Sequence, residues 1–448
     1  MLFNFNSNSP KKHSSSDRPR VVVVGAGFGG TEIVRQFRNE PVEVMLIDRH
    51  NYHTFQPLLY QVVTAGLEPE EIAWSVRDIF QGVENFSFRM ATVTDVDFES
   101  RQVIVNGDDP IDYDYLVLAA GASTDYFGVD GAEEHSYSLK NLMNAMNLRS
   151  HILEQFEKVE KHPELIDQGG LNFVIVGGGP TGVETAGALV ELFKMVLQKD
   201  FPDIDVDQAR VILVEMNEHL LDPYDESLRQ YTLDTLRNRG VEVLLEKSVV
   251  KAEEDYVELN TGETIQTQSL IWAAGVRANP LADRLDVSQT RNGRIQVRKD
   301  LRLPDQPNVF VIGDMAGNRN SQGELDPQLA PVAIQGARHT TTQILNLEAG
   351  LPTESFEYDP PGKMATVGIN AAVAELPGGI KLSGFPAWVI WVFLHIMKLV
   401  GFRNRLLVFF DWVYNYFTYD RAARLIMDVE PESDRLEDLE VLESESTM

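Results

Sequence analysis

The chain of 448 residues contains no cysteine. Without thiols there are no disulfides, no thiolate metal sites and no cysteine-based redox relay. Basic residues are also few, since 39 Lys and Arg stand against 68 Asp and Glu, for a formal net charge of −29. Such a surface repels nucleic acid, so no nucleic-acid partner is expected. The excess of acids is typical of a solvation strategy, for instance at high salt.

Long apolar runs are missing too. Residues 1–20 are polar and lack the apolar core of a signal peptide. The apolar runs 385–400 and 406–417 are each shorter than the ~20 residues of a membrane span, and they carry Lys398 and Asp411. A route for proton pumping through the membrane is therefore not expected.

Two glycine-rich turns are the most informative feature that is present. Each follows a run of mainly β-branched residues, at 21–24 and 173–176, and each fits a buried parallel strand, a G-x-G-x-x-G turn and a helix. The first glycine makes the tight turn, the second admits a pyrophosphate, and the third lets helix and strand pack closely. Two such turns indicate two dinucleotides between which electrons pass.

A carboxylate follows the second strand of each predicted unit. The strand 42–47 ends at Asp48, where a βαβ unit places the acid that binds an adenosine ribose; a plain loop acid is the alternative. The strand 211–214 ends at Glu215, after an extended helix and loop at 193–208. A carboxylate at Glu215 would repel a 2′-phosphate, which favours NADH over NADPH unless a nearby arginine overrides it.

Three more strands end in short turns. The segments 116–122 and 270–276 each bring a strand's C-terminal end against a nucleotide. The strand 309–312 runs into Gly313 and Asp314, where glycine permits close backbone approach and the carboxylate accepts hydrogen bonds from hydroxyls.

These elements, in this order, resemble the two-dinucleotide flavoprotein reductases of the glutathione-reductase type, over about residues 20–345. The resemblance implies an α/β fold with two Rossmann-like domains, in which a nicotinamide domain is inserted into an FAD domain. Gly313 and Asp314 would hold the ribityl and pyrophosphate part of FAD. The implied FAD contacts are Gly25, Gly27, Phe28, Gly29, Gly30, Asp48, Arg49, Val93, Gly121, Asp314 and Val332. The implied NADH contacts are Gly177, Gly179, Pro180, Thr181, Gly182, Glu215 and Gly275.

The expected organisation follows from this resemblance and from composition. It comprises a disordered tail at 1–19, an FAD-binding domain in two parts at 20–135 and 299–380, an NADH-binding domain at 136–298, membrane-associating helices at 381–427 and an acidic disordered tail at 428–448.

Within this group the chain resembles the type II NADH:quinone oxidoreductases. One signature is HNYHTFQPLLYQV at 50–62. Disulfide reductases of this fold carry a redox cysteine pair after the ribose acid, where this chain has PLLY at 57–60, so electrons must leave the flavin for a free acceptor. Core packing is the alternative interpretation of 55–60, and the favoured one for Leu58 and Leu59.

The second signature is APVAIQ at 330–335, where the resembled family often has A-Q-x-A-x-Q at the start of a helix aimed at the flavin ring. Pro331 suits a first helical turn but removes one amide that would bind quinone. Gln335 is therefore the predicted quinone ligand, and a surface or interdomain Gln is the alternative.

Glu184 is the other predicted catalytic residue, and it lies in the first turns of the second nucleotide helix. An acid at a helix N-terminus is its plain explanation. In the resembled family this position faces the junction of nicotinamide and flavin and is implicated in proton delivery, for which burial would raise the carboxyl pKa suitably.

The C-terminal apolar runs predict two helices that lie in the membrane surface, and a dimer-forming or core pair is the alternative. Aromatic residues expected at the interface are Trp388, Trp391, Trp412 and Tyr414. Cations expected at lipid headgroups are Lys398, Arg403 and Arg405. Asp411, Asn415 and Thr418 recur on one helix face. The resembled family uses this region so that quinone enters without leaving the bilayer.

The resemblance thus predicts a monotopic enzyme on the cytoplasmic side of the cell inner membrane, as a homodimer. It would pass a hydride from NADH to FAD and then two electrons to a membrane quinone. Sulfide:quinone oxidoreductases are rivals that need cysteines. A reductase of a specialised quinone or isoprenoid is a second rival, and a signalling flavoprotein of the apoptosis-inducing kind is a third.

Overall fold

The computed structural model describes residues 18–418 and 423–427. Residues 1–17 of the predicted first tail and the whole predicted acidic tail at 428–448 lie outside them. The chain forms two compact units, each assembled from three segments. The described residues of the first unit are 18–51, 80–121 and 278–358, and those of the second are 52–79, 122–277 and 359 onward.

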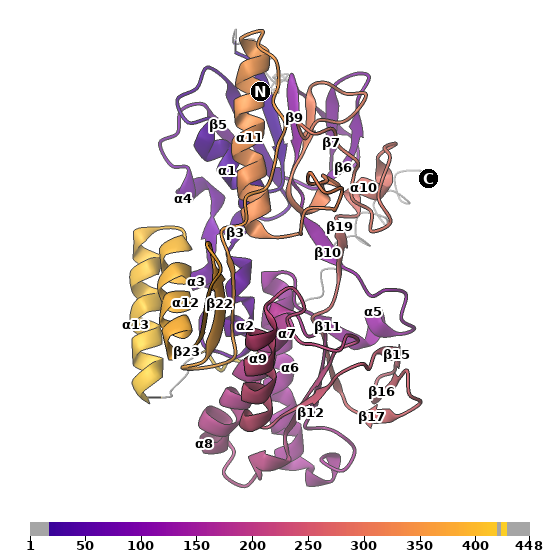
Figure 1. Ribbon diagram of the computed structural model, residues 1–448, viewed down its shortest axis with the longest axis vertical. Coiled ribbons are helices and arrows are strands. Elements are labelled where there is room, and N and C mark those ends of the chain that lie inside the picture. The colour runs from indigo at the N-terminus through magenta and orange to yellow at the C-terminus, as the bar shows by residue number, and fades with distance from the viewer. Residues whose placement is uncertain (1–17, 419–422, 428–448) are drawn as a thin grey trace, which may run out of the picture. The chain divides into compact units, whose positions relative to one another are not determined.

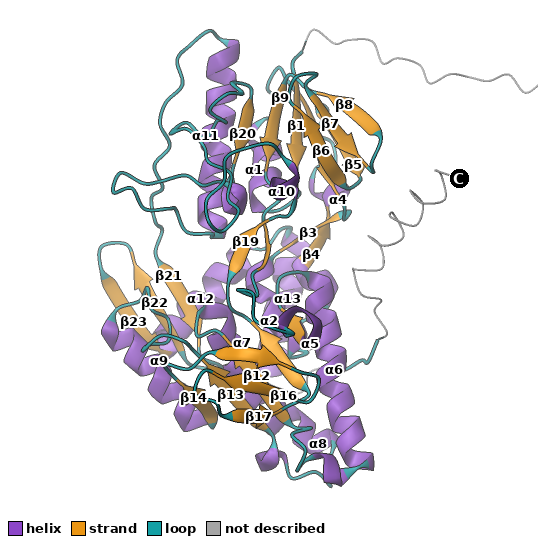
Figure 2. Ribbon diagram, turned by 90° about the vertical axis from the view of Figure 1, so that its right-hand side faces the viewer, coloured by secondary structure: helices purple, strands orange, loops and turns teal. Residues whose placement is uncertain are grey.

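A parallel sheet of five strands forms the centre of the first unit, in the order β20-β9-β1-β2-β5 (Figures 1 and 2). Its strands are β1 (Arg20–Val24), β2 (Glu43–Asp48), β5 (Phe86–Met90), β9 (Tyr115–Leu118) and β20 (Val309–Val311). In register, Val24 lies beside both Ile47 of β2 and Leu118 of β9. The predicted α/β class is confirmed, because strands buried on both faces of a parallel sheet carry continuous apolar runs.

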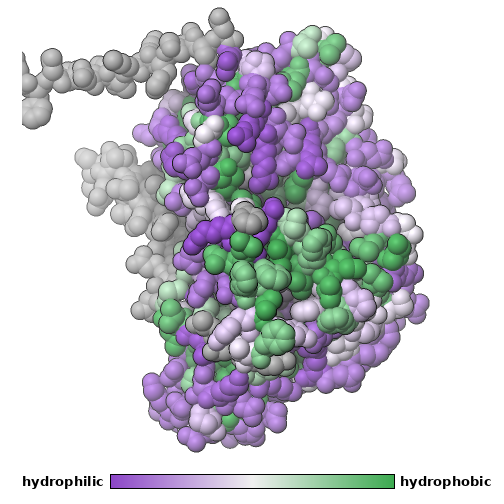
Figure 3. All heavy atoms as spheres, turned by 90° about the vertical axis from the view of Figure 1, so that its left-hand side faces the viewer, coloured by the Kyte–Doolittle hydropathy of each residue, from purple (hydrophilic) through white to green (hydrophobic). Residues whose placement is uncertain are grey.

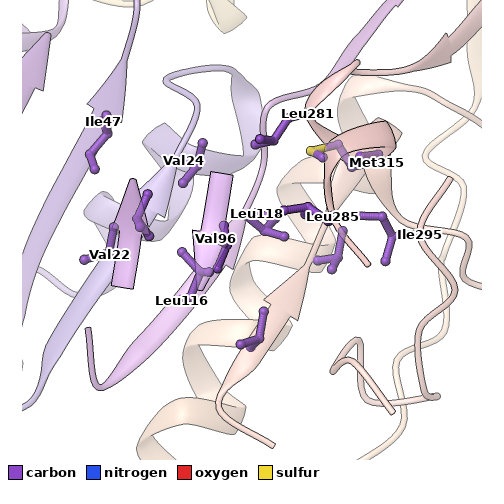
Figure 4. Packing of buried hydrophobic residues seen from close by; sticks show 14 of the residues in the cluster. Val22, Val24, Ile47, Val96, Leu116, Leu118, Leu281, Leu285, Ile295 and Met315 are labelled. Carbon is purple, nitrogen blue, oxygen red and sulfur yellow. The ribbon is translucent and has the colours of Figure 1, made fainter. Parts of the chain in front are cut away.

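Two helices and a small antiparallel sheet pack on this centre. The helices are α1 (Phe28–Gln36) and α11 (Ala330–Glu348), which contact each other, and the antiparallel strands are β6 (Val93–Asp97), β7 (Gln102–Val105) and β8 (Asp109–Asp112). Figure 4 shows the shared core, in which Val24 of β1 and Leu118 of β9 belong to one buried cluster with Val96 of β6. The short helix α10 (Leu281–Arg284) also belongs to the first unit, whereas α4 (Val76–Ile79) belongs to the second.

The second unit repeats the plan with the order β11-β18-β12-β13-β14. The strands are β11 (Ser136–Ser138), β12 (Asn172–Val176), β13 (Arg210–Val214), β14 (Val241–Leu244) and β18 (Ser269–Trp272). The main helices are α6 (Leu142–Lys161), α7 (Pro180–Leu192) and α9 (Glu226–Arg239), and an antiparallel sheet contains β15 (Val249–Ala252), β16 (Tyr256–Leu259) and β17 (Thr264–Gln266). The predicted helix and loop at 193–208 is present as a π-helical turn, α8 (Gln198–Asp200) and a 3-10 turn.

Shorter elements complete the chain. They are β3 (Tyr52–Thr54), β4 (Ala73–Ser75), α2 (Leu59–Val63), α3 (Pro69–Ile72), β10 (Ala122–Thr124), α5 (Ala132–His135), β19 (Val276–Ala278), β21 (Lys363–Thr366), β22 (Ala372–Leu376) and β23 (Ile380–Gly384). After them come α12 (Phe385–Lys398) and α13 (Phe402–Thr418), the two helices predicted from the apolar runs.

The terminal helices carry an apolar surface (Figure 3). Its most exposed large side chains are Phe385, Phe393, Phe410, Tyr414 and Phe417. Among the described helices, none is long and apolar enough to cross a membrane.

The inner faces of these helices differ from expectation. Trp391 was expected at an interface but is only 2% exposed, and its ring stacks on Trp412 with centroids 5.6 Å apart. The prediction is wrong for Trp391, because α12 turns this face toward the protein. The polar face of α13 also packs inward, since the Asn415 Nδ2 donates to the Gly66 carbonyl at 3.2 Å.

A pair of carboxyl groups joins α13 to α3. Glu71 hydrogen-bonds Asp411, and burial together with this acidic neighbour raises the pKa of Glu71 to about 8. The Glu68 carboxylate adds further negative charge, and Arg149 on α6 lies 3.6 Å from it. A hydrogen bond between two carboxyl groups requires that one of them keep a proton.

We therefore expect α13 to loosen as the pH rises. The folded-state pKa of Glu71 is raised, so its contribution is present below the ordinary value of 4.5 and is lost as the pH passes about 8. Asp411→Asn should keep α13 attached, because an amide can donate to the ionised Glu71. Hydrogen exchange of α13 amides at about pH 6.5 and about pH 9, corrected for intrinsic rates, measures this. An identical pH response in parent and variant would contradict the assignment.

Candidate functional site

The first glycine turn connects β1 to α1. Gly25 has φ +104°, a left-handed conformation that favours glycine. A Cβ on Gly30 would overlap the carbonyl oxygen of Gly25, so strand and helix meet with no room for a side chain. By contrast, a Cβ on Gly27, the N-cap residue of α1, would meet no atom within 4 Å. This open position at a helix N-terminus suits an approaching phosphate.

The Asp48 carboxylate lies beside this turn at the end of β2. Its Oδ2 accepts a hydrogen bond from the Ala26 N–H at 2.6 Å, and its Oδ1 accepts one from the His50 N–H at 2.7 Å. Each carboxylate oxygen has two acceptor positions, so both retain capacity for a ribose hydroxyl. Asp48 therefore both braces the turn and presents an acceptor at its rim.

The other predicted residues of the first unit lie mostly at the same edge of the sheet. Gly121 follows β9 and has φ +75°, and Asp314 follows β20. Because β20, β9 and β1 are neighbours in a parallel sheet, their C-terminal ends converge on the turn. Val332 is buried in the first turns of α11, and Val93 begins β6 with its side chain against the core. The remaining three lie at the turn or after β2, namely Phe28 and Gly29 at the start of α1 and Arg49, which is exposed.

The second glycine turn, between β12 and α7, repeats this geometry. Gly177 has φ +109°, and a Cβ on Gly182 would overlap the Gly177 carbonyl oxygen. Gly179 is the N-cap residue of α7, and a Cβ there would meet nothing within 4 Å. Pro180 and Thr181 open the helix, where a proline costs no hydrogen bond.

Glu215 matches Asp48 at the end of β13. It is buried, its Oε2 accepts from the Gly178 N–H at 2.5 Å, and its Oε1 accepts from the Asn217 N–H at 2.7 Å. Gly275 follows β18 with φ +67°. Its neighbour Ala274 lies against the glycine turn, since a Cβ on Gly177 would come within 2.9 Å of it.

Glu184 lies deep in the second unit on α7. Its Oε1 accepts a hydrogen bond from the Thr366 N–H at 3.2 Å, and burial raises the pKa of its carboxyl to about 8. A buried acid that holds its proton near neutral pH can serve as a proton donor. Its position in α7, beyond the first turn, makes helix-dipole stabilisation a poor explanation of this residue.

A cavity of about 310 Å³ is lined only by residues of the second unit. Glu184 is not on its wall, but Thr366, whose N–H donates to Glu184, is. Its walls are largely apolar and come from α2, α7, α12 and α13. The polar groups on the wall form a chain, in which the Gln61 Nε2 donates to the Tyr60 hydroxyl at 3.0 Å, and this hydroxyl lies 3.2 Å from the Thr366 Oγ1. Thr366 thus connects Tyr60 to Glu184.

Most of this wall has no signal in the sequence. Thr366 and Glu191 carry no motif, although Glu191 lies two helical turns after Glu184 and so shares its helix face. In the structure, Glu191 forms an ion pair with Arg239 and accepts from the Ile369 N–H at 2.6 Å. The favoured core-packing interpretation of Leu58 and Leu59 is confirmed, since both are buried.

Gln335 is partly buried on α11 of the first unit, about one turn after Pro331. Pro331 occupies the first turn of the helix, as expected. Gln335 and Glu184 therefore belong to different units. A metal site is not among the features of the described residues, which contain no cluster of three potential ligands.

Two protein-family models match most of this chain. The family model of the pyridine nucleotide-disulphide oxidoreductases matches residues 19–337, and that of the NDH2 C-terminal domain matches 361–419. The type II NADH:quinone oxidoreductase Ndh of Mycobacterium tuberculosis is 35% identical, covering 98% of this chain and 97% of that protein. An internal alternative NAD(P)H-ubiquinone oxidoreductase of Solanum tuberosum is 28% identical over 89% of this chain and 86% of that protein.

Solved structures share the fold. NDH2 from Plasmodium falciparum in complex with NADH has a TM-score of 0.83 at 20% identity, covering 92% of this chain and 100% of that one. The sulfide:quinone oxidoreductase of Aquifex aeolicus has a TM-score of 0.68 at 18% identity, covering 89% of this chain and 95% of that one.

Proposed function

Because the chain belongs to the type II NADH:quinone oxidoreductases, within the pyridine nucleotide-disulphide oxidoreductase family, we propose how its residues divide the work. The first unit holds FAD and the second holds NADH. The activity is NADH:quinone oxidoreduction of the non-proton-pumping type. Bound FAD supplies hydride acceptance and electron transfer, and the protein supplies binding, orientation and protons.

The observation that carries the proposal is the repeated pair of an open glycine and a carboxylate. Gly27 with Asp48, and Gly179 with Glu215, each offer space for a pyrophosphate beside an acceptor for ribose hydroxyls. The Glu215 carboxylate accepts hydrogen bonds from two backbone N–H groups, which hold it in place. A 2′-phosphate there would face a fixed negative charge, so NADH is preferred to NADPH.

Quinone occupies the cavity beside Glu184 in this proposal. Its mostly apolar wall suits an isoprenoid quinone, and the Tyr60 and Thr366 hydroxyls supply hydrogen bonds. Glu184 holds a proton that reduction of a quinone consumes. Gln335 stays a proposed quinone ligand because the resemblance at APVAIQ implies it, and Pro331 adds no side-chain donor.

The three alternative functions are supported to different degrees. The chain shares its fold with a sulfide:quinone oxidoreductase, but it has no cysteine to hold sulfur. A substrate screen distinguishes a specialised quinone from a common one as the acceptor. The apolar surface on α12 and α13 disfavours a purely signalling flavoprotein, because a soluble protein rarely exposes so large an apolar patch.

The same surface supports the proposed attachment to a bilayer. The cytoplasmic side of the inner membrane is part of the proposal through the family resemblance alone. Side chains such as Phe393, Phe410 and Phe417 would enter the acyl boundary. Lys398 and Arg403 are exposed at the helix junction, where headgroups would meet them. A homodimer belongs to the proposal too, because exposed apolar helix faces also suit contact between two copies.

Substitution of the open glycines tests the cofactor assignment. Gly27→Val and Gly179→Val should both fold, since each side chain points into empty space. Gly27→Val should lose its flavin, whereas Gly179→Val should stay yellow but resist reduction by NADH. Absorbance of the purified proteins before and after NADH addition is the measurement. A Gly179→Val protein that NADH bleaches at the parent rate would refute the two-site assignment.

Glu184→Gln should slow quinone reduction, by about 10- to 100-fold, and spare flavin reduction by NADH. In the parent, the rate at which a soluble quinone reoxidises the reduced flavin should fall as the pH rises through about 8, because the carboxyl of Glu184 loses its proton. The variant should lack this fall, since glutamine does not titrate. Stopped-flow traces over about pH 6 to 10 test both points. If the variant retains the parent pH profile, another group donates the proton.

Charge on the apolar face tests membrane attachment. Phe410→Glu and Phe417→Glu together should abolish flotation with anionic liposomes, because burying two carboxylates opposes insertion. The attachment of the parent should weaken but persist at high salt, since apolar burial provides most of it. As a control, Met90→Glu and Leu351→Glu together introduce the same two charges at exposed apolar positions of the first unit. Equal flotation of the double variant and the parent would show that this face serves another role.

A further inference from the structure

Phe127 is a residue of the second unit that the proposed function does not use and that packing does not explain. Its side chain is 61% exposed, and its backbone has φ +53°. A left-handed conformation is strained for a bulky side chain, and such outliers persist where the surroundings hold them for a purpose. Because its side chain is exposed and its backbone is strained, Phe127 contributes little to the stability of the folded unit.

The surrounding segment is firmly anchored. The Asp125 N–H donates to the Gly275 carbonyl at 3.3 Å, and the Trp272 Nε1 donates to the Asp125 carbonyl at 2.9 Å. The Asp125 Oδ1 also accepts from the Phe127 N–H at 2.8 Å, which fixes the turn. The ring of Tyr126 packs on Trp272 with centroids 5.6 Å apart. Phe127 is therefore a rigid ring on an anchored turn and not the tip of a loose loop.

The ring lies against the turn after β18. A Cβ on Gly275 would overlap the far edge of the Phe127 ring, so the two residues are in contact. β18 and β13 lie on opposite sides of β12 in the sheet. A dinucleotide whose pyrophosphate is at the turn after β12 and whose adenosine ribose is at Glu215 after β13 must send its other half over the end of β18. That end is where Phe127 lies.

We propose that Phe127 contacts the nicotinamide half of NADH and positions it, as an aromatic wall beside Gly275. The inference rests on the proposed NADH site at Gly179 and Glu215. A flat ring offers apolar contact to the nicotinamide ring at little entropic cost, because its turn is already fixed. The Phe127 ring already occupies the position that a side chain at Gly275 would take, so the ring itself forms the wall there.

The test compares two ligands that differ only in the nicotinamide. Titration calorimetry of full-length, flavin-loaded protein in detergent gives dissociation constants for NAD⁺ and for ADP-ribose. Phe127→Ala should raise the Kd of NAD⁺ about tenfold and leave that of ADP-ribose within about twofold, whereas Phe127→Tyr should bind both as the parent does. Val250→Ala, at another exposed apolar position of the unit, is the control that should change neither.

The outcomes separate the two levels of the proposal. Equal weakening of both ligands in Phe127→Ala, or no weakening of either, would overturn the role of Phe127. Glu215→Gln should weaken both ligands, and unchanged binding in that variant would count against the NADH site itself. Should Phe127→Ala fail to fold, Phe127→Leu applies the same comparison with an apolar side chain that keeps bulk but lacks the ring.

Discussion

Both nucleotide-binding units depend on the approach of a helix glycine to the carbonyl oxygen at the end of a strand. Gly30 meets Gly25 in the first unit, and Gly182 meets Gly177 in the second. This contact sets the helix directly against the sheet and so determines where its first N–H groups point. A side chain at either position would displace the helix and its N-terminus together. The proposed phosphate sites are therefore products of backbone packing, and the acids beside them brace the turns in addition to their proposed contact with ribose.

The parts of the fold that sequence reasoning predicted are those with local signals. A glycine spacing, a valine run and an acid at a strand end are each read within a few residues, and the strands and turns at Gly25 and Gly177 follow from them. The cavity beside Glu184 has no such signal, because Tyr60 and Thr366 meet only through the tertiary fold. Amphipathicity likewise shows that α13 has two faces but not which one meets the protein, and for the same reason the burial of Trp391 was missed.

The inner and outer faces of the terminal helices α12 and α13 differ in what they contact. Their inner faces close the cavity, with Trp391 and Trp412 stacked on its wall, and their outer faces carry the exposed aromatic residues. A molecule that partitions into the apolar side of a membrane would therefore meet the enzyme on the same helices that line its proposed binding cavity. The hydrogen bonds of Asn404 and Asn415 to backbone carbonyls tie α13 to the rest of the unit, so the cavity wall and the exposed apolar face belong to one packed element.

The interleaving of the two units imposes an order on biosynthesis. The sheet of the second unit is complete once β18, ending at Trp272, has been synthesised, whereas the sheet of the first unit waits for β20 at Val309–Val311. Until then β9 has an unpaired edge of backbone donors and acceptors, because β20 is its partner on that side. The nascent chain thus carries an incomplete N-terminal sheet while a later module folds, and this interval is when a ribosome-associated chaperone would protect it from aggregation.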